Sequence, residues 1–228
     1  MKRLLAPLFT GALLASGSAS AQETVDIGVI RESDISVVQK LLYPKTDRTE
    51  LGVHLGWMPF DALLTTPNLQ ASFNLHMNET LSISAMLGGG YGLKNGTYRE
   101  LESDKYGIAP DAYRYLGSAL VGVELAPIYA KMNLGAARII HYDVYGSARA
   151  GATFESSVIP TGGFAVAPTL SLGAGARFFV SPRSAIRLEL RDDLLIERRK
   201  LTQTTHFKQN ANITIGFTML SAVKEKRR

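Results

Sequence analysis

Apolar and polar side chains alternate with a period of two in eight separate stretches of the chain. In IRLELRDD, for example, Ile186, Leu188 and Leu190 share one face and the residues between them are charged. Because successive side chains of a β-strand point to opposite faces, this period predicts strands rather than helices. The eight stretches are residues 50–57, 70–77, 81–91, 118–129, 138–150, 169–179, 186–193 and 211–219.

The segments between these strands alternate in length. Long polar segments follow the first, third, fifth and seventh strands, and short turns follow the second, fourth and sixth. An even number of antiparallel strands with short turns at one end and long loops at the other is typical of outer-membrane barrels. Each strand has about the 9–11 residues needed to cross a bilayer at a tilt. We therefore predict an all-β fold, an eight-stranded antiparallel transmembrane β-barrel with up-and-down topology over residues 49–220.

Alternation alone does not say which face of the barrel is outside. A soluble periplasmic barrel of the lipocalin type, binding an apolar ligand, would carry its apolar face inside. Here the polar face is rich in Gly, Ser, Asn and His and almost lacks Lys, and aromatic residues end several apolar faces, at Trp57, Tyr91, Tyr129 and Phe178. Aromatic side chains favour the membrane–water boundary. These features favour an apolar face toward lipid, and the soluble barrel stays as the alternative.

The polar face should then fill the lumen, which in an eight-stranded barrel is only wide enough for side chains. Charges removed from water must be paired, and the acids and arginines on this face nearly balance. We therefore predict a structural network of ion pairs and hydrogen bonds that plugs the barrel, so that it is not a pore. Its members are Glu50, His54, His76, Glu124, His141, Asp143, Arg149, Arg177, Arg187, Glu189, Arg191 and Asp193.

Catalytic and metal-binding alternatives draw on the same polar face. His141, Asp143 and Ser147 have the residue types of a catalytic set, but His141 and Ser147 would lie ~20 Å apart along one strand at about 3.3 Å per residue. A metal site would need His54, His76 and His141 to converge from three strands of unknown register. An enzyme that modifies envelope lipid is a further alternative, although the apolar faces offer only tyrosine hydroxyls. We predict no enzymatic activity, no cofactor and no metal.

The two ends of the chain carry signals of their own. Two early basic residues, an apolar run over 4–14 and small residues after it predict a cleaved signal peptide over 1–21, and thus export to the outer membrane. The apolar run is shorter than the ~20 residues of a membrane-spanning helix. Residues 22–48 are expected to form a periplasmic segment with a short helix, and residues 221–228 form a basic tail.

Charge limits the classes of partner. The formal net charge of +5 falls to +3 without Lys2 and Arg3, and the last five residues contribute +3 themselves, from four bases and one acid. The body between is neutral, which argues against a nucleic-acid partner. The chain has no cysteine, so burial and backbone pairing must hold the fold together.

Membrane lipid and envelope proteins are the partners that this pattern favours. Envelope proteins are expected to bind through the long loops or through residues 23–47. One long loop carries four tyrosines among charged residues, a mixture common at recognition surfaces, although such rings can equally pack a loop on itself. These tyrosines are Tyr98, Tyr106, Tyr113 and Tyr115.

Four stretches of the chain carry a family resemblance. They are VVQKLLYPKTDRTELG (37–52), LAPIYAKMNL (125–134), IIHYDVYGSARAG (139–151) and GGFAVAPTLSLGAGARFFVSPRSAIRLELRDD (162–193). Together they resemble the outer-membrane β-barrel family described mainly from myxobacteria and related deltaproteobacteria. The resemblance implies an exported barrel, some relatives of which are encoded near envelope or gliding-motility genes. It implies no enzymatic activity and no functional residues, and it does not extend to the tyrosine-containing loop.

Overall fold

The structure is a computed structural model that describes residues 41–108, 110–134, 138–158, 163–198 and 204–222. Its long strands are β1 (Thr49–Met58), β2 (Leu64–His76), β3 (Leu81–Gly90), β5 (Tyr113–Leu134), β6 (Arg138–Ser157), β7 (Phe164–Ser181), β8 (Ser184–Arg198) and β9 (Thr205–Leu220). The two-residue strand β4 (Leu93–Lys94) and the helix α1 (Gly96–Glu102) lie between β3 and β5. The predicted signal peptide and most of both the predicted short helix and the basic tail lie outside the described residues.

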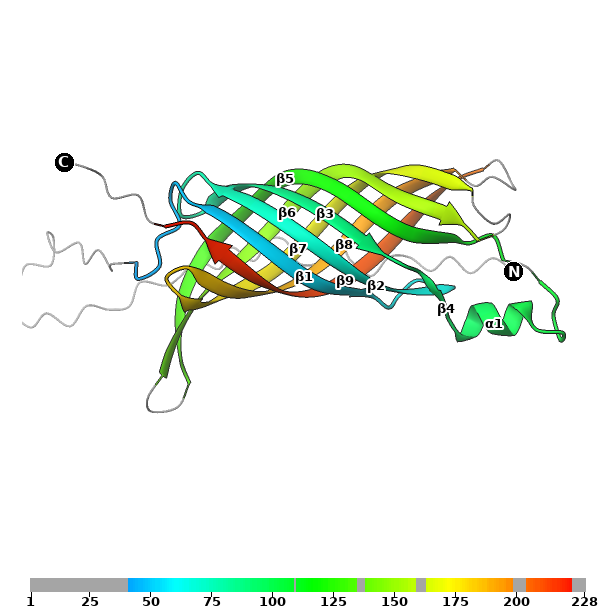
Figure 1. Cartoon of the computed structure of the whole chain (residues 1–228), viewed down its shortest axis with the longest axis horizontal. Coiled ribbons are helices and arrows are strands. Elements are labelled where there is room, and N and C mark those ends of the chain that lie inside the picture. Colours follow the sequence, from blue (N-terminus) through cyan, green and yellow to red (C-terminus); the bar gives the residue numbers. More distant parts are fainter. Residues whose placement is uncertain (1–40, 109, 135–137, 159–162, 199–203, 223–228) are drawn as a thin grey trace, which may run out of the picture. The chain divides into compact units, whose positions relative to one another are not determined.

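The long strands pair antiparallel in chain order, and the last strand returns to the first. β1 pairs with β2 on one side and with β9 on the other, where Glu50 lies opposite Leu220, so the sheet closes into a ring. Figure 1 shows the strands wound at a tilt around one axis, with the β2–β3 and β7–β8 turns at one end and β4 and α1 at the other. The predicted eight-stranded up-and-down barrel is therefore confirmed. We call its two ends the short-turn end and the long-loop end.

The apolar face of the strands points outward. Along β1, Leu51, Val53 and Leu55 are 63%, 57% and 65% exposed, whereas Glu50 and His54 are 0% and 3% exposed. A bilayer requires an apolar exterior on a sheet without free edges, because lipid offers no partners for backbone polar groups. The structure therefore confirms the transmembrane arrangement and excludes the soluble barrel with an apolar interior.

Aromatic rings stack in pairs near both rims of this apolar exterior. Tyr142 of β6 stacks on Phe178 of β7 near the short-turn end, with 5.8 Å between ring centroids. Near the long-loop end, Phe154 and Phe164 of the same two strands stack at 6.1 Å. Rings in these positions are typical of the two membrane–water boundaries of a transmembrane barrel.

The expectation that Tyr129 ends the lipid-facing row of its strand is wrong. A β-bulge between Leu125 and Ile128 sets two residues of β5 opposite one residue of β6. The extra residue reverses the alternation beyond the bulge. Ile128 then takes the outward position, and the Tyr129 hydroxyl instead hydrogen-bonds His141 at 2.9 Å.

Several segments expected to be loops belong to strands. β8 and β9 remain paired as far as Arg198 opposite Thr205, well into a segment whose sequence has no clear alternation. β5 and β6 likewise extend to Leu134 opposite Arg138, where a short turn was expected. Beyond the bilayer a strand no longer separates lipid from lumen, so the alternation fades while the backbone pairing continues.

The long loop after β3 is packed onto the barrel. Tyr98 of α1 is fully buried in an apolar cluster with Leu64, Ala112 and Val158. Asn95 caps the helix by accepting a hydrogen bond from the Tyr98 N–H at 2.9 Å, a usual role for Asn before a first turn. No helix in the described part of the chain is long and apolar enough to cross a membrane.

Candidate functional site

A cluster of buried charges lies inside the barrel, and we call it the charge cluster. Its acids are Glu50 of β1, Glu124 of β5, Asp143 of β6 and Glu189 of β8, and its bases are Arg149 of β6, Arg177 of β7, Arg187 of β8 and Lys45 from the segment before β1. Each of these side chains is at most 4% exposed. Four carboxylates thus face four cations away from bulk water.

Arg177 and Arg187 connect most of the acids. Arg177 lies 2.9 Å from Asp143 and 3.2 Å from Glu50, and it also donates to Glu124. Arg187 lies 3.3 Å from Glu50 and likewise donates to Glu124. A guanidinium presents several donors in a fixed plane, so one arginine can bind several carboxylates at once. The cluster is therefore one connected network rather than a set of separate pairs.

Tyr145 joins the charge cluster, although it was not among the predicted lumen residues. Its ring centroid lies 4.3 Å from the guanidinium carbon of Arg187, and its hydroxyl donates to Glu189 at 3.0 Å and accepts from Arg187 at 3.1 Å. Arg149 donates to the same Glu189 at 2.7 Å. The period-two pattern places Tyr145 on the polar face, and that position was the signal that could have identified it.

Lys45 supplies a positive charge that the strands lack. Toward the long-loop end, Arg191 and Asp193 form their own pair at 3.0 Å. Of the predicted charges this leaves four acids and three arginines, and the Lys45 ammonium binds Asp143 as the fourth cation. Residue 45 was expected in a periplasmic segment outside the barrel, so the sequence pattern did not find this contact. The segment before β1 completes the charge balance of the lumen.

Arg48 fastens this segment to the short-turn end. Its guanidinium donates to the backbone oxygens of Pro44, Pro182 and Ser221 at 2.8, 2.8 and 2.7 Å. These acceptors belong to the segment itself, to the β7–β8 turn and to the chain just after β9. One side chain therefore joins three parts of the chain beside the seam between β1 and β9. We call residues 44–48 the mouth segment.

Glu79, in the β2–β3 turn, also holds the mouth segment. Its carboxylate accepts from the N–H of Lys45 at 3.0 Å and from the N–H and the hydroxyl of Thr46 at 3.1 and 2.6 Å. Partial burial alone would raise the pKa of Glu79, but the hydrogen bonds from Thr46 and Lys45 outweigh it and lower the pKa below the ordinary value of 4.5. Docking of the segment therefore favours the ionised carboxylate.

The predicted lumen histidines lie apart. His76 hydrogen-bonds Glu50 at 2.8 Å, and His54 hydrogen-bonds Ser72 at 2.7 Å. His141 bonds a tyrosine hydroxyl at the base of the extended β5–β6 hairpin. Within the described ranges, no three His, Cys, Asp or Glu side chains are grouped so that they could hold a metal ion. Each histidine thus has a separate polar partner.

The set His141, Asp143 and Ser147 does not form a proton relay in the structure. His141 is bonded to the Tyr129 hydroxyl, and Asp143 binds two cations of the charge cluster. The hydroxyl of Ser147 has no hydrogen-bond partner. A relay would need hydrogen bonds that join the base, its orienting acid and the nucleophile.

Polar side chains also occupy the lumen between the charge cluster and the long-loop end. Arg191 donates to Gln70 at 3.1 Å, Gln70 to Asn68 at 2.5 Å and Asn68 to Asn212 at 3.4 Å. All twelve predicted lumen residues are at most 7% exposed. The period-two pattern therefore placed every one of them on the correct side of the sheet.

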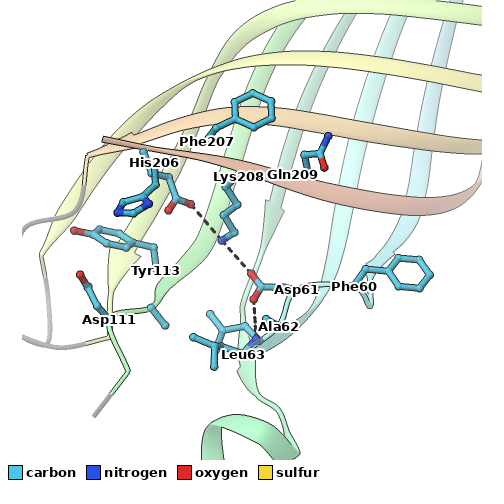
Figure 2. Close-up of a pocket in the computed structure, with 13 residues that line it drawn as sticks. Phe60, Asp61, Ala62, Leu63, Asp111, Tyr113, His206, Phe207, Lys208 and Gln209 are labelled. Carbon is cyan, nitrogen blue, oxygen red and sulfur yellow. Dashed lines mark hydrogen bonds and ion pairs between the residues drawn. The ribbon is translucent and has the colours of Figure 1, made fainter. Parts of the chain in front are cut away.

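A second charged group lies at the long-loop end, and its members come from three segments that were expected to be loops. Lys208 lies 3.0 Å from Asp61, 3.3 Å from Glu197 and 3.8 Å from Glu155. Figure 2 shows Lys208 pointing toward Asp61 beside a cavity of about 340 Å³. Because β9 begins at residue 205, well before the alternation becomes clear, the sequence pattern did not reveal this group.

The tyrosines proposed as a recognition surface are mostly buried. Tyr98, Tyr113 and Tyr115 are at most 3% exposed, and only Tyr106, at 47%, is open to solvent. The Tyr115 hydroxyl hydrogen-bonds Ser118 at 2.9 Å inside the barrel. Of the two alternatives left open by the sequence, packing describes three of the four rings, because β5 begins earlier than predicted and carries two of the rings inward, while Tyr98 packs under the loop.

Comparisons with known proteins find likeness in fold only. No protein-family model and no curated protein sequence matches the chain. Among solved structures, the outer membrane protein OprG from Pseudomonas aeruginosa is 9% identical with a TM-score of 0.47, covering 78% of this chain and 98% of that chain. Ail, the attachment invasion locus protein of Yersinia pestis, is 11% identical with a TM-score of 0.41, covering 77% and 99%.

A de novo designed transmembrane β-barrel is 15% identical with a TM-score of 0.37, and the match covers 78% of this chain and 98% of that chain. At these identities and scores, the barrel architecture rests on the strand pairing and the apolar exterior of this chain itself.

Replacing Arg187 by Leu should lower the free energy of unfolding by about 3–5 kcal/mol, because it leaves buried carboxylates without a cation. Glu124→Leu should be destabilising as well. The double variant keeps equal numbers of acids and bases and should be less destabilised than the sum of the two single variants. Urea unfolding in lipid vesicles measures all four proteins, and strict additivity would contradict a coupled network.

The hydrogen bonds between Glu79 and the mouth segment should be lost at acidic pH. The folded pKa of Glu79 lies below its ordinary value of 4.5, so its contribution is present above that value and is lost as the pH falls through the lowered pKa. Amide hydrogen exchange of Lys45 and Thr46, corrected for the intrinsic rate, should accelerate over this range. In Glu79→Gln the corrected exchange of these two amides should already be fast at neutral pH, and it should not accelerate further as the pH falls. A variant that still showed the acceleration at acidic pH would contradict the role of Glu79.

Proposed function

We propose that this protein is a sealed, non-enzymatic barrel of the outer membrane, and that it serves as a scaffold or binds a partner in the cell envelope. The observation that carries the proposal is the balance of four buried acids by four buried bases, with the mouth segment supplying one of the bases. The resemblance to the myxobacterial and deltaproteobacterial barrel family supports an exported barrel.

A neutral, connected network inside the barrel supports a sealed lumen. Ions pass through a pore only where water fills a continuous path, and the lumen of an eight-stranded barrel is narrow enough for side chains to fill. Here Arg149, Arg177 and Arg187, from three strands, reach across the lumen and share carboxylates. Moving any of them aside would expose unpaired charge in a medium of low dielectric constant, which is strongly unfavourable.

The asymmetry of the two ends supports an orientation in the outer membrane. Barrels of that membrane place short turns in the periplasm and longer loops outside the cell. In this orientation the mouth segment lies at the periplasmic mouth, and residues 23–47 belong to the periplasmic side of the membrane. A signal peptide over 1–21, cleaved on export, belongs to the same proposal.

The periplasmic side is where we place the partner. The long-loop end offers fewer exposed tyrosines than the sequence suggested, while Arg48 and Glu79 hold the mouth segment in a defined position. Because the mouth segment is already fixed, the residues before it lose less conformational entropy when they bind a partner, which favours association. We therefore propose that residues 23–47 form a docking arm for an envelope protein, with membrane lipid around the barrel and no nucleic acid as partner.

Purified protein in planar lipid bilayers should show no steady single-channel current. As a matched control for insertion, the charge-balanced variant Arg187→Ala with Glu124→Ala removes two side chains that fill the lumen, and it should give measurable currents. Steady channels from the unaltered protein would contradict the sealed lumen.

An affinity-tagged chain, cross-linked in native envelopes, should capture one or more envelope proteins. Deleting residues 23–40 should abolish this capture, while Ile108→Asp, an exposed substitution at the long-loop end, should leave it unchanged. Heat-modifiable migration on a gel would verify that both variants still form the barrel. Capture that survives the deletion would rule out the docking arm.

A further inference from the structure

The β5–β6 hairpin leaves the barrel wall at the short-turn end. Among the described residues, β3 pairs with β5 only as far as Leu81 opposite Leu125, and β7 pairs with β6 only from Phe179 opposite His141. β5 and β6 nevertheless continue to pair with each other from Ile128 opposite Val144 to Leu134 opposite Arg138. We call residues 128–134 and 138–140 the ribbon. Its outer part, residues 132–134 with 138–140, is two-stranded, because β3 and β7 do not extend that far.

The ribbon projects sideways from the barrel. In Figure 1 it runs steeply away from the long axis of the barrel and passes beyond the outline of the wall. The bulge between Leu125 and Ile128 lies at its base, and bulges bend the strand that carries them. When a wall strand turns outward at the edge of a bilayer, its lipid-facing side turns toward the surface of that bilayer. The ribbon is thus placed along the membrane and not along the barrel axis.

One face of the ribbon continues the lipid-facing surface of the barrel. Ile128 lies opposite Val144, and Met132 lies opposite Ile140, with Ala130 between them on the same face. Ile128 is 53% exposed, Met132 is 40% exposed and Val144 is 36% exposed. The bulge keeps these residues in phase with the outward residues of β6. Apolar exposure therefore runs without interruption from the barrel wall onto the ribbon.

The opposite face of the ribbon is more polar, and the ribbon is basic. Tyr129, Lys131 and Asn133 alternate with the apolar row, and Lys131 lies opposite His141. Ile139 is the apolar exception on this face. From residue 127 to residue 140 the sequence holds two basic residues and no acidic one. This charge complements the phosphate groups of a phospholipid surface.

We propose that the ribbon lies on the leaflet at the short-turn end, with Ile128, Met132 and Ile140 among the lipids and Asn133 toward water. Two features indicate that the ribbon contacts lipid and not another protein. Its apolar face is continuous with the lipid-facing barrel wall, and its charge is opposite to that of the phosphate headgroups. Amphipathic elements with one apolar face and basic residues bind membrane interfaces in this way. The ribbon widens the footprint of the barrel on one leaflet.

Spin labelling tests the proposal directly, because the chain has no cysteine and needs no background substitutions. Met132→Cys and Asn133→Cys place a label on the two faces of the ribbon, one residue apart. Val123→Cys on the lipid-facing wall and Lys105→Cys in an exposed loop give the lipid and water references. The full chain is reconstituted into vesicles of phosphatidylethanolamine and phosphatidylglycerol, and collision of each label with oxygen and with a water-soluble nickel chelate is measured.

The ratio of oxygen to nickel collisions should be several-fold higher at position 132 than at position 133, and close to that of the Val123→Cys reference. Lys131→Glu should lower the ratio at position 132 when phosphatidylglycerol is present. Water-like ratios at both positions would overturn the proposal. So would labels shielded from both reagents, since that pattern indicates contact with protein, either a partner or a second copy of the chain.

Discussion

A sheet that closes on itself within a bilayer turns its polar face inward, and every charge on that face must then be neutralised inside the lumen. The desolvation of a single buried ion costs several kcal/mol, which is similar to the total free energy of unfolding of a typical domain. A single unpaired carboxylate in the lumen would therefore be enough to destabilise the fold. Arg177 and Arg187 meet this constraint by sharing carboxylates from several strands. The ionic network and the closure of the barrel therefore depend on each other.

The same constraint couples the mouth segment to the barrel. The strands alone supply four acids and three arginines to the charge cluster, and Lys45 adds the fourth cation by binding Asp143, which Arg177 also contacts. Docking of the segment is thus favoured by the electrostatics of the lumen as well as by the hydrogen bonds of Arg48 and Glu79. A segment outside the sheet therefore contributes a side chain to the interior of the barrel.

The period of two in the sequence predicted the strands and which of their side chains face the lumen or the lipid. Glu189 and Arg187 could be assigned to the lumen because their neighbours Leu188 and Leu190 face lipid. Lys45 could not be assigned, because it lies outside the strands and its role depends on a charge count over the whole lumen. Tyr129 was misplaced because one extra residue in a bulge reverses the alternation, and the local sign of that bulge is Pro127, since proline inside a sheet is found mainly at edges and bulges. Strand ends were missed where the strands leave the bilayer.

The distribution of interactions also indicates where function can reside in this molecule. The interior is occupied by side chains whose positions are set by mutual charge, so a change there alters stability before it alters specificity. The ends are different. Tyr98 and Lys208 tie the connections of the long-loop end to the rim, and Arg48 ties the mouth segment to the seam. Surfaces held in this way lose little freedom on binding, so the two ends are better suited than the interior to contact other molecules.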